Sequence, residues 1–177
     1  MSSNVTHPKI DAGDHKGYMQ YALEQARRSP PKPTNFCVGA VLVDATKNEI
    51  LATGYTLELE GNTHAEQCCF TKMAQEHNVA EETLGEVLPE GTVLYTTMEP
   101  CNKRSVGNTP CTERILRLNR AIKDVYAGVL EPEKFVGENV GRKRLADAGI
   151  KVTLVEGLEK EILEVATAGH KDDKTSS

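Results

Sequence analysis

The sequence predicts an α/β protein, a three-layer α/β/α sandwich around a mixed five-stranded sheet. Apolar runs rich in β-branched residues at Cys37–Asp44 and Gly91–Met98 have the character of buried strands. Two further strands are expected at Asp124–Leu130 and Lys151–Val155, with a helix between them. Because a crossover of this kind joins parallel strands, we expect strands four and five to pair in parallel.

The N-terminal part predicts a helix followed by a hairpin. Residues 1–14 are polar and are interpreted as a flexible arm. Apolar residues recur at three- and four-residue steps over His15–Ser29, and Asp14 can cap this helix. The prolines that follow end it. The strand that ends at Asp44 then turns into a second strand at Glu49–Thr56.

The remaining segments alternate between helices and strands. After an exposed loop, four helices are expected at His64–Asn78, Cys111–Leu118, Val140–Ala148 and Leu158–Thr167. Residues 169–177 form a polar tail, so the predicted domain spans residues 15–168.

Composition limits the function classes. The 177 residues are 38% hydrophobic and 27% charged, as in an ordinary globular domain. The net charge of −5 argues against a broad nucleic-acid surface. No apolar run is long enough to cross a bilayer or to form a signal peptide, so we expect a cytoplasmic protein without a membrane partner. The five cysteines show no disulfide framework and suit thiols or metal ligands.

One group of residues in the sequence has the composition and spacing of a catalytic site. His64 and Glu66 stand in an H-A-E motif, and E-P-C at 99–101 is followed nine residues later by Cys111. His64, Cys101 and Cys111 provide an imidazole and two thiolates, a zinc set that leaves one position for water. Glu66 is then available to move protons and is not itself a ligand. These residues predict a catalytic zinc site.

Two questions about this site stay open in the sequence. Cys68 lies one helical turn after His64 and could complete a closed Cys₃His structural site without room for water. In addition, residues two apart on a regular helix face different directions. His64 and Glu66 can therefore serve one pocket only if His64 stands at the start of its helix.

At these residues the chain resembles the cytidine deaminase-like superfamily, and more narrowly the pyrimidine deaminases of riboflavin biosynthesis. The wide spacing before Cys111, with Gly107-Asn108-Thr109-Pro110 directly ahead of it, is similar to theirs. Asn35 matches the asparagine of their N-x-x-V-G motif. Thr56 stands where the bacterial enzymes carry histidine, so that Gly54–Cys68 resembles the fungal branch. The resemblance implies a cytidine deaminase-like fold and a homodimer.

The implied activity is that of a zinc-dependent aminohydrolase. It would remove the 2-amino group of 2,5-diamino-6-ribitylamino-4(3H)-pyrimidinone 5′-phosphate, with Glu66 moving the protons. By analogy, the Asn35 amide and the Ala65 backbone N–H would hold the pyrimidine edge, with Asn62 as a further contact. Two other functions stay open: another deaminase of this fold, acting on a nucleoside, free base or tRNA, and a non-enzymatic zinc-stabilised interaction module.

The insert between the two predicted cysteine ligands suggests how a phosphorylated ribityl chain is bound. Its cationic, hydroxyl and amide side chains suit an anion and a polyol. These residues are Lys103, Arg104, Ser105, Asn108 and Thr109. The alternative is that Lys103 and Arg104 are solvated loop charges.

Overall fold

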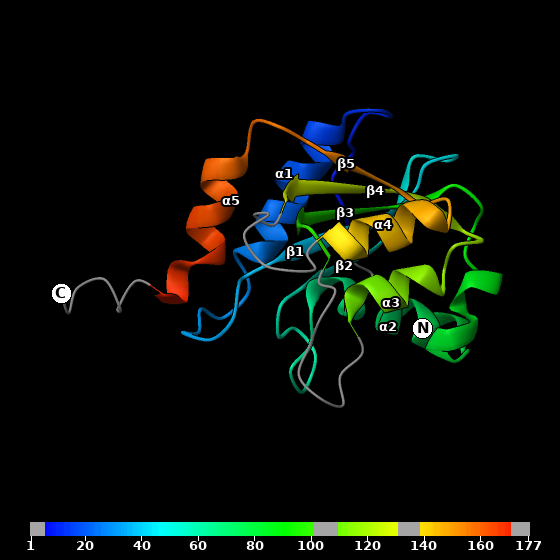
Figure 1. Cartoon of the computed structure of the whole chain (residues 1–177), viewed down its shortest axis with the longest axis horizontal. Coiled ribbons are helices and arrows are strands. Elements are labelled where there is room, and N and C mark those ends of the chain that lie inside the picture. The colour runs from blue at the N-terminus through cyan, green and yellow to red at the C-terminus, as the bar shows by residue number, and fades with distance from the viewer. Residues whose placement is uncertain (1–5, 101–109, 131–138, 171–177) are drawn as a thin grey trace.

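The computed structural model describes residues 6–100, 110–130 and 139–170. Its five strands form one sheet in the order β2-β1-β3-β4-β5. One face of the sheet packs against α1 and α5, and the other against α2, α3 and α4 (Figure 1). The predicted three-layer α/β/α sandwich is therefore confirmed.

The direction of the strands brings the carboxyl ends of the three parallel strands to the same end of the sheet. The strands are β1 (Gly39–Asp44), β2 (Glu49–Tyr55), β3 (Thr92–Met98), β4 (Ile122–Val129) and β5 (Lys151–Leu154). β1 pairs with β2 and β3 in antiparallel fashion, whereas β3, β4 and β5 are parallel. The predicted parallel pairing of the last two strands is confirmed, and β3 extends this parallel half of the sheet.

The helices agree with the predicted ones to within a few residues at their ends. They are α1 (His15–Ala26), α2 (Ala65–His77), α3 (Cys111–Leu116), α4 (Asn139–Asp147) and α5 (Glu159–Ala166). The helix α1 ends at Ala26 and not at Ser29, because Arg28 and Ser29 bond to the third residue back, as in a turn. Within the described ranges, no helix has both the length and the apolar character needed to cross a membrane.

A 3₁₀ helix, η1 (Glu81–Glu86), was not predicted. Its sequence, E-E-T-L-G-E, has no helical repeat of apolar residues, and only Leu84 is buried. A single buried side chain gives no periodic signal, which explains the omission.

The alternation of side chains along β3 decides which residues face α2. Leu94 packs into the core beneath α2 with Leu42 and Phe70, whereas Tyr95 packs on the α1 side. Because side chains alternate between the faces of a strand, Thr96 faces α2 like Leu94. A polar side chain is thus placed in the layer that carries the candidate site.

Gly54 allows α2 to lie directly on β2. A Cβ at this position would lie 2.2 Å from the carbonyl oxygen of Ala65 and 3.0 Å from the Cβ of Cys68. Contacts this short are not tolerated, so the first turn of α2 needs a glycine beneath it. Since Glu66 lies in that turn, Gly54 sets the height of a site residue above the sheet.

Gly54→Ala is expected to push the first turn of α2 away from the sheet. Overpacking of this kind lowers the free energy of unfolding by about 1–3 kcal/mol. Denaturant unfolding measures the change. Gly85→Ala is the comparison variant, because its added Cβ would lie 3.2 Å from the nearest atom, a milder contact for which a smaller loss of stability is expected. Equal stability of the Gly54→Ala and unaltered proteins would contradict the role of Gly54.

Candidate metal centre

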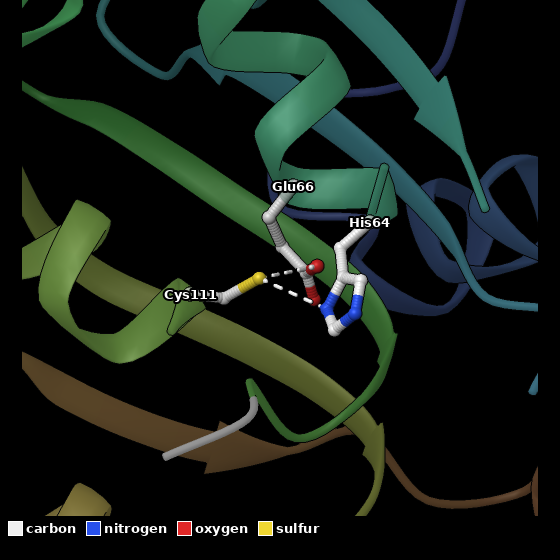
Figure 2. A group of neighbouring side chains, drawn as sticks. All are labelled: His64, Glu66 and Cys111. Carbon is white, nitrogen blue, oxygen red and sulfur yellow. Dashed lines mark hydrogen bonds between the residues drawn. The ribbon is translucent and has the colours of Figure 1, made fainter. Parts of the chain in front are cut away.

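Three side chains meet where α2 and α3 begin. His64, Glu66 and Cys111 each have a side-chain atom of a type that can bind a metal, and these three atoms all lie within 4.8 Å of one another. Figure 2 shows His64 and Glu66 at the start of α2 and Cys111 at the start of α3, pointing toward each other. Glu66 is 3% exposed and Cys111 is fully buried, while His64 is half-buried. This arrangement brings together three of the four residues predicted for the zinc site and its proton carrier.

The backbone at His64 explains how His64 and Glu66 reach one site. His64 is the N-cap of α2, with the extended angles φ −93° and ψ 159°. Its N–H donates to Oε1 of Gln67 at 3.2 Å, and its carbonyl accepts from the N–H of Cys68 at 3.0 Å. His64 therefore stands before the regular helix, and its imidazole turns toward Glu66. The orientation problem raised by the sequence is resolved.

The Glu66 carboxylate is oriented from the sheet. Oγ1 of Thr96 donates to Oε1 of Glu66 at 2.7 Å, and it lies 2.9 Å from the carbonyl oxygen of Met98. Oε2 of Glu66 lies 3.4 Å from Sγ of Cys111. Thr96 thus holds one carboxylate oxygen and leaves the other facing the candidate metal ligands.

Thr96→Val is expected to destabilise the protein through Glu66. The substitution nearly conserves shape but removes a hydroxyl from a buried carboxylate, a loss that costs about 1–3 kcal/mol. Denaturant unfolding checks this value. Thr96→Ser keeps the hydroxyl and is expected to restore most of the stability. If valine and serine have the same effect, the hydrogen bond to Glu66 does not matter.

The described ligands fit a zinc ion. Sγ of Cys111 and Nδ1 of His64 are 3.4 Å apart. Tetrahedral zinc, with Zn–S of about 2.3 Å and Zn–N of about 2.0–2.1 Å, places two such atoms about 3.5 Å apart. The two side chains can therefore share one ion without rearrangement. The third predicted ligand, Cys101, lies outside the described residues, directly after the buried Pro100.

Cys68 is not part of this group. Its buried thiol donates to the carbonyl oxygen of Tyr55 at 3.6 Å. Burial raises the pKa of the Cys68 thiol, and its sulfur lies outside the group of possible metal-binding atoms formed by His64, Glu66 and Cys111. The geometry favours the open three-ligand site over the closed Cys₃His site.

The structure describes only some of the residues that were predicted to contact the substrate. Ala65 is buried as the first residue of α2, and Asn62 is exposed in the loop before it. Asn35 is half-buried in the loop before β1, and its carbonyl accepts from Nε2 of His170 at 2.9 Å. The predicted contacts of the insert lie outside the described residues: Lys103, Arg104, Ser105, Asn108 and Thr109.

The loop that carries Asn35 enters β1 at the edge of the sheet where the site lies. The first residue of β1, Gly39, donates its N–H to Oγ1 of Thr97 at 3.1 Å. Thr97 follows Thr96, which holds Glu66. Asn35 itself lies four residues before β1, and its contact with the pyrimidine stays a prediction.

Sequence reasoning missed two side chains that support the site. Thr96 belongs to a run of apolar and hydroxyl residues in β3 and gives no signal of its own. Arg142 of α4 forms an ion pair with Glu99 of the E-P-C motif. Spacing along the chain could not reveal either partner, because each contact joins segments that are distant in sequence.

The chain has an α/β/α sandwich with a His-x-Glu pair at the start of one helix and a buried cysteine at the start of another. These features are typical of proteins that bind a catalytic zinc ion. Residues 12–129 match the family model of the cytidine and deoxycytidylate deaminase zinc-binding region. The chain belongs to this family. Membership in this family confirms the predicted resemblance to the cytidine deaminase-like superfamily. It also confirms that zinc is the cofactor.

Individual relatives are also similar to this chain. The diaminohydroxyphosphoribosylamino-pyrimidine deaminase of Schizosaccharomyces pombe is 38% identical over 157 residues, which cover 89% of this chain and 36% of that protein. A crystal structure of the Aspergillus oryzae Rib2 deaminase, a C-terminal deletion mutant, has 47% identity and a TM-score of 0.81, covering 92% of this chain and 95% of that one. The same deaminase in complex with DARIPP has 46% identity and a TM-score of 0.80, with coverage of 91% and 94%.

Proposed function

We propose that this chain hydrolytically deaminates 2,5-diamino-6-ribitylamino-4(3H)-pyrimidinone 5′-phosphate, a step of riboflavin biosynthesis. The observation that carries the proposal is the buried Glu66 carboxylate beside His64 and Cys111. The relatives support the substrate class. One is named for a phosphoribosylamino-pyrimidine, and another was crystallised with DARIPP. Since the chain spans 36% of the Schizosaccharomyces protein, that protein's activity is carried over as a proposal.

The reaction consumes one water and releases one ammonia. A carbon–oxygen bond forms at the ring carbon, and its bond to the amino nitrogen breaks. Zinc, held by His64, Cys111 and the predicted ligand Cys101, would supply a Lewis acid that lowers the pKa of water toward neutrality.

Glu66 carries the protons. Its Oε2 faces Cys111, so this oxygen takes the proton of the attacking water and passes it to a ring nitrogen. It then takes the second proton of the water, from the hydroxyl now bonded to the ring carbon, and delivers it to the departing amine, which leaves as ammonia. Thr96 keeps the carboxylate pointed at the reacting atoms by holding Oε1. Because Glu66 is buried, bulk water does not compete for these protons.

Substrate orientation is assigned to groups around the start of α2. The backbone N–H of Ala65 belongs to the first helical turn, whose N–H groups have no partner within the helix. It would bind the polar edge of the pyrimidine together with the Asn35 amide and Asn62. The cationic and hydroxyl side chains of the insert would bind the phosphate and the ribityl chain.

Ammonia release from the zinc-loaded protein and the proposed substrate tests the function. Stoichiometric ammonia and deaminated product are expected. Turnover of the dephosphorylated substrate shows how much the phosphate contributes to substrate binding. Assays with cytidine, cytosine, guanine and tRNA test the other deaminase activities. Zinc-loaded protein that leaves the phosphorylated substrate unchanged would refute the proposal.

A homodimer and a cytoplasmic location also stay predictions, supported by the family resemblance and by the sequence. Sedimentation equilibrium at several protein concentrations measures the assembly. A molecular mass of one chain at every concentration would contradict the dimer.

A further inference from the structure

The segment that follows α5 contacts the loop that carries Asn35. Residues 168–170 form a 3₁₀ turn at the end of this helix, and the N–H of His170 donates to the carbonyl oxygen of Thr167 at 2.9 Å. Nε2 of His170 lies 2.9 Å from the main-chain carbonyl oxygen of Asn35. Because a carbonyl oxygen can only accept, Nε2 is the donor of this hydrogen bond. Figure 1 shows the end of α5 beside the loop between α1 and β1, so two distant parts of the sequence meet here.

Asn35 is the last residue of a tight turn, and both ends of this turn are contacted. The N–H of Asn35 donates to the carbonyl oxygen of Lys32 at 3.4 Å, which closes the turn over Pro33 and Thr34. A Cβ on Gly169 would lie 2.4 Å from the backbone N and O of Lys32, so the two backbones meet at a distance that only glycine permits. Two consecutive residues after α5 therefore hold the first and the last residue of the turn.

The turn lies largely outside the core, so these contacts are important for its position. Residues 32–34 are exposed, and Phe36 is 47% exposed. The rings of Phe36 and His170 lie edge to face, with centroids 5.0 Å apart and an interplanar angle of 71°, an arrangement that aromatic rings favour. The N–H of Cys37 donates to the carbonyl oxygen of Ala166, the last residue of α5, at 3.0 Å. The chain is thus held by α5 and His170 until it enters the sheet.

The turn is close along the chain to the part of the sheet that supports Glu66. Asn35 stands four residues before Gly39, the first residue of β1, so the connecting chain is at most about 14 Å long. The N–H of Gly39 donates to Oγ1 of Thr97, and the neighbouring Thr96 holds the Glu66 carboxylate. Over so short a connection, the direction of the turn decides whether the Asn35 side chain reaches a substrate bound at Glu66.

We propose that His170 is a positioning residue for the substrate site, which orients the turn that carries Asn35 and does not itself touch the pyrimidine. Gly169 supports the same turn by allowing the two backbones to meet. A hydrogen bond that fixes the main-chain carbonyl of Asn35 also restricts the direction of its side chain. The inference rests on the proposed function, in which the Asn35 amide binds the polar edge of the pyrimidine.

Steady-state kinetics of the zinc-loaded full chain tests the proposal. His170→Phe keeps an aromatic ring for the contact with Phe36 and removes the donor. The loss of one neutral hydrogen bond changes an equilibrium constant by about 2–10-fold. Because a pyrimidine contact of this kind is made equally before and in the transition state, KM is expected to rise by about 2–10-fold while kcat and zinc content stay unchanged. His170→Gln keeps an N–H donor and is expected to restore KM.

The control for the substitution is His77→Phe, which makes the same change at an exposed position at the end of α2. Amide exchange of the zinc-loaded protein, followed by NMR, measures the turn without substrate. The N–H groups of Asn35 and Cys37 are expected to exchange about 2–10-fold faster in His170→Phe and at the original rate in His77→Phe. Gly169→Ala is expected to raise KM as well, because its methyl group would displace the backbone of Lys32.

The outcomes separate this inference from the proposed function. Faster exchange and a lower melting temperature in His170→Phe, with KM at the level of the unaltered protein, would show a purely structural role and would overturn the inference. Unchanged exchange in His170→Phe would overturn it as well. An unaltered zinc-loaded protein that does not turn over the substrate would refute the proposed function and this inference together. Turnover by the unaltered protein with a normal KM in both His170→Phe and Gly169→Ala would refute the inference alone.

Discussion

Glu66→Gln is expected to keep zinc and to lower turnover of the proposed substrate by about 10²–10⁴-fold, the usual contribution of general acid–base catalysis. Glutamine has nearly the shape of glutamate and can still accept a hydrogen bond from Thr96. It cannot take a proton from water at neutral pH. The loss should therefore appear in kcat, with the zinc content and the melting temperature close to those of the unaltered protein.

The control for this prediction lies on the same helix. Glu76→Gln makes the same change of charge at an exposed position of α2 and is expected to leave turnover unaffected. Zinc content is determined for both variants by elemental analysis. Turnover of Glu66→Gln within tenfold of the unaltered enzyme would exclude Glu66 as the proton carrier. Loss of zinc from the same variant would show instead that Glu66 is a ligand.

Cys111→Ala is expected to remove zinc from the protein and to abolish turnover. Sγ of Cys111 lies 3.4 Å from Nδ1 of His64, at the separation that two ligands of one zinc ion require. Without this sulfur, zinc affinity should fall by more than the about 10–100-fold that a supporting residue contributes. Elemental analysis after dialysis against a weak chelator measures the zinc that remains.

Cys68→Ala is the matched control, since Cys68 and Cys111 are both fully buried. Each alanine substitution removes one buried sulfur and costs similar packing energy. Only Cys111→Ala should lose zinc. If Cys68→Ala lost zinc as well, the closed Cys₃His site would replace the open catalytic one.

Much of the fold was predictable because its signals are local. The apolar run at 37–44 predicted β1, and the crossover after β4 predicted the parallel pairing with β5. The 3₁₀ helix at Glu81–Glu86 was missed because one buried leucine leaves no periodic pattern. The end of α1 was placed too late, since the first proline marks a boundary that the helix does not reach.

The candidate site was predictable for a different reason. Metal chemistry requires particular residue types, and His64, Glu66 and Cys111 are recognisable from type and spacing alone. The side chains that hold these residues in place cannot be recognised from the sequence. Thr96 and Arg142 are ordinary residues in a strand and a helix, and each acquires a role only through its contact with Glu66 or Glu99.

The sequence by itself predicted the five strands and the five α-helices of the described structure, and it predicted a metal site in the stretch from His64 to Cys111. Local periodicity and residue chemistry are sufficient for both. Only the tertiary structure decided which side chain orients the Glu66 carboxylate. Such contacts depend on strand register, and a slip of one residue in β3 would turn Thr96 to the opposite face of the sheet, away from Glu66.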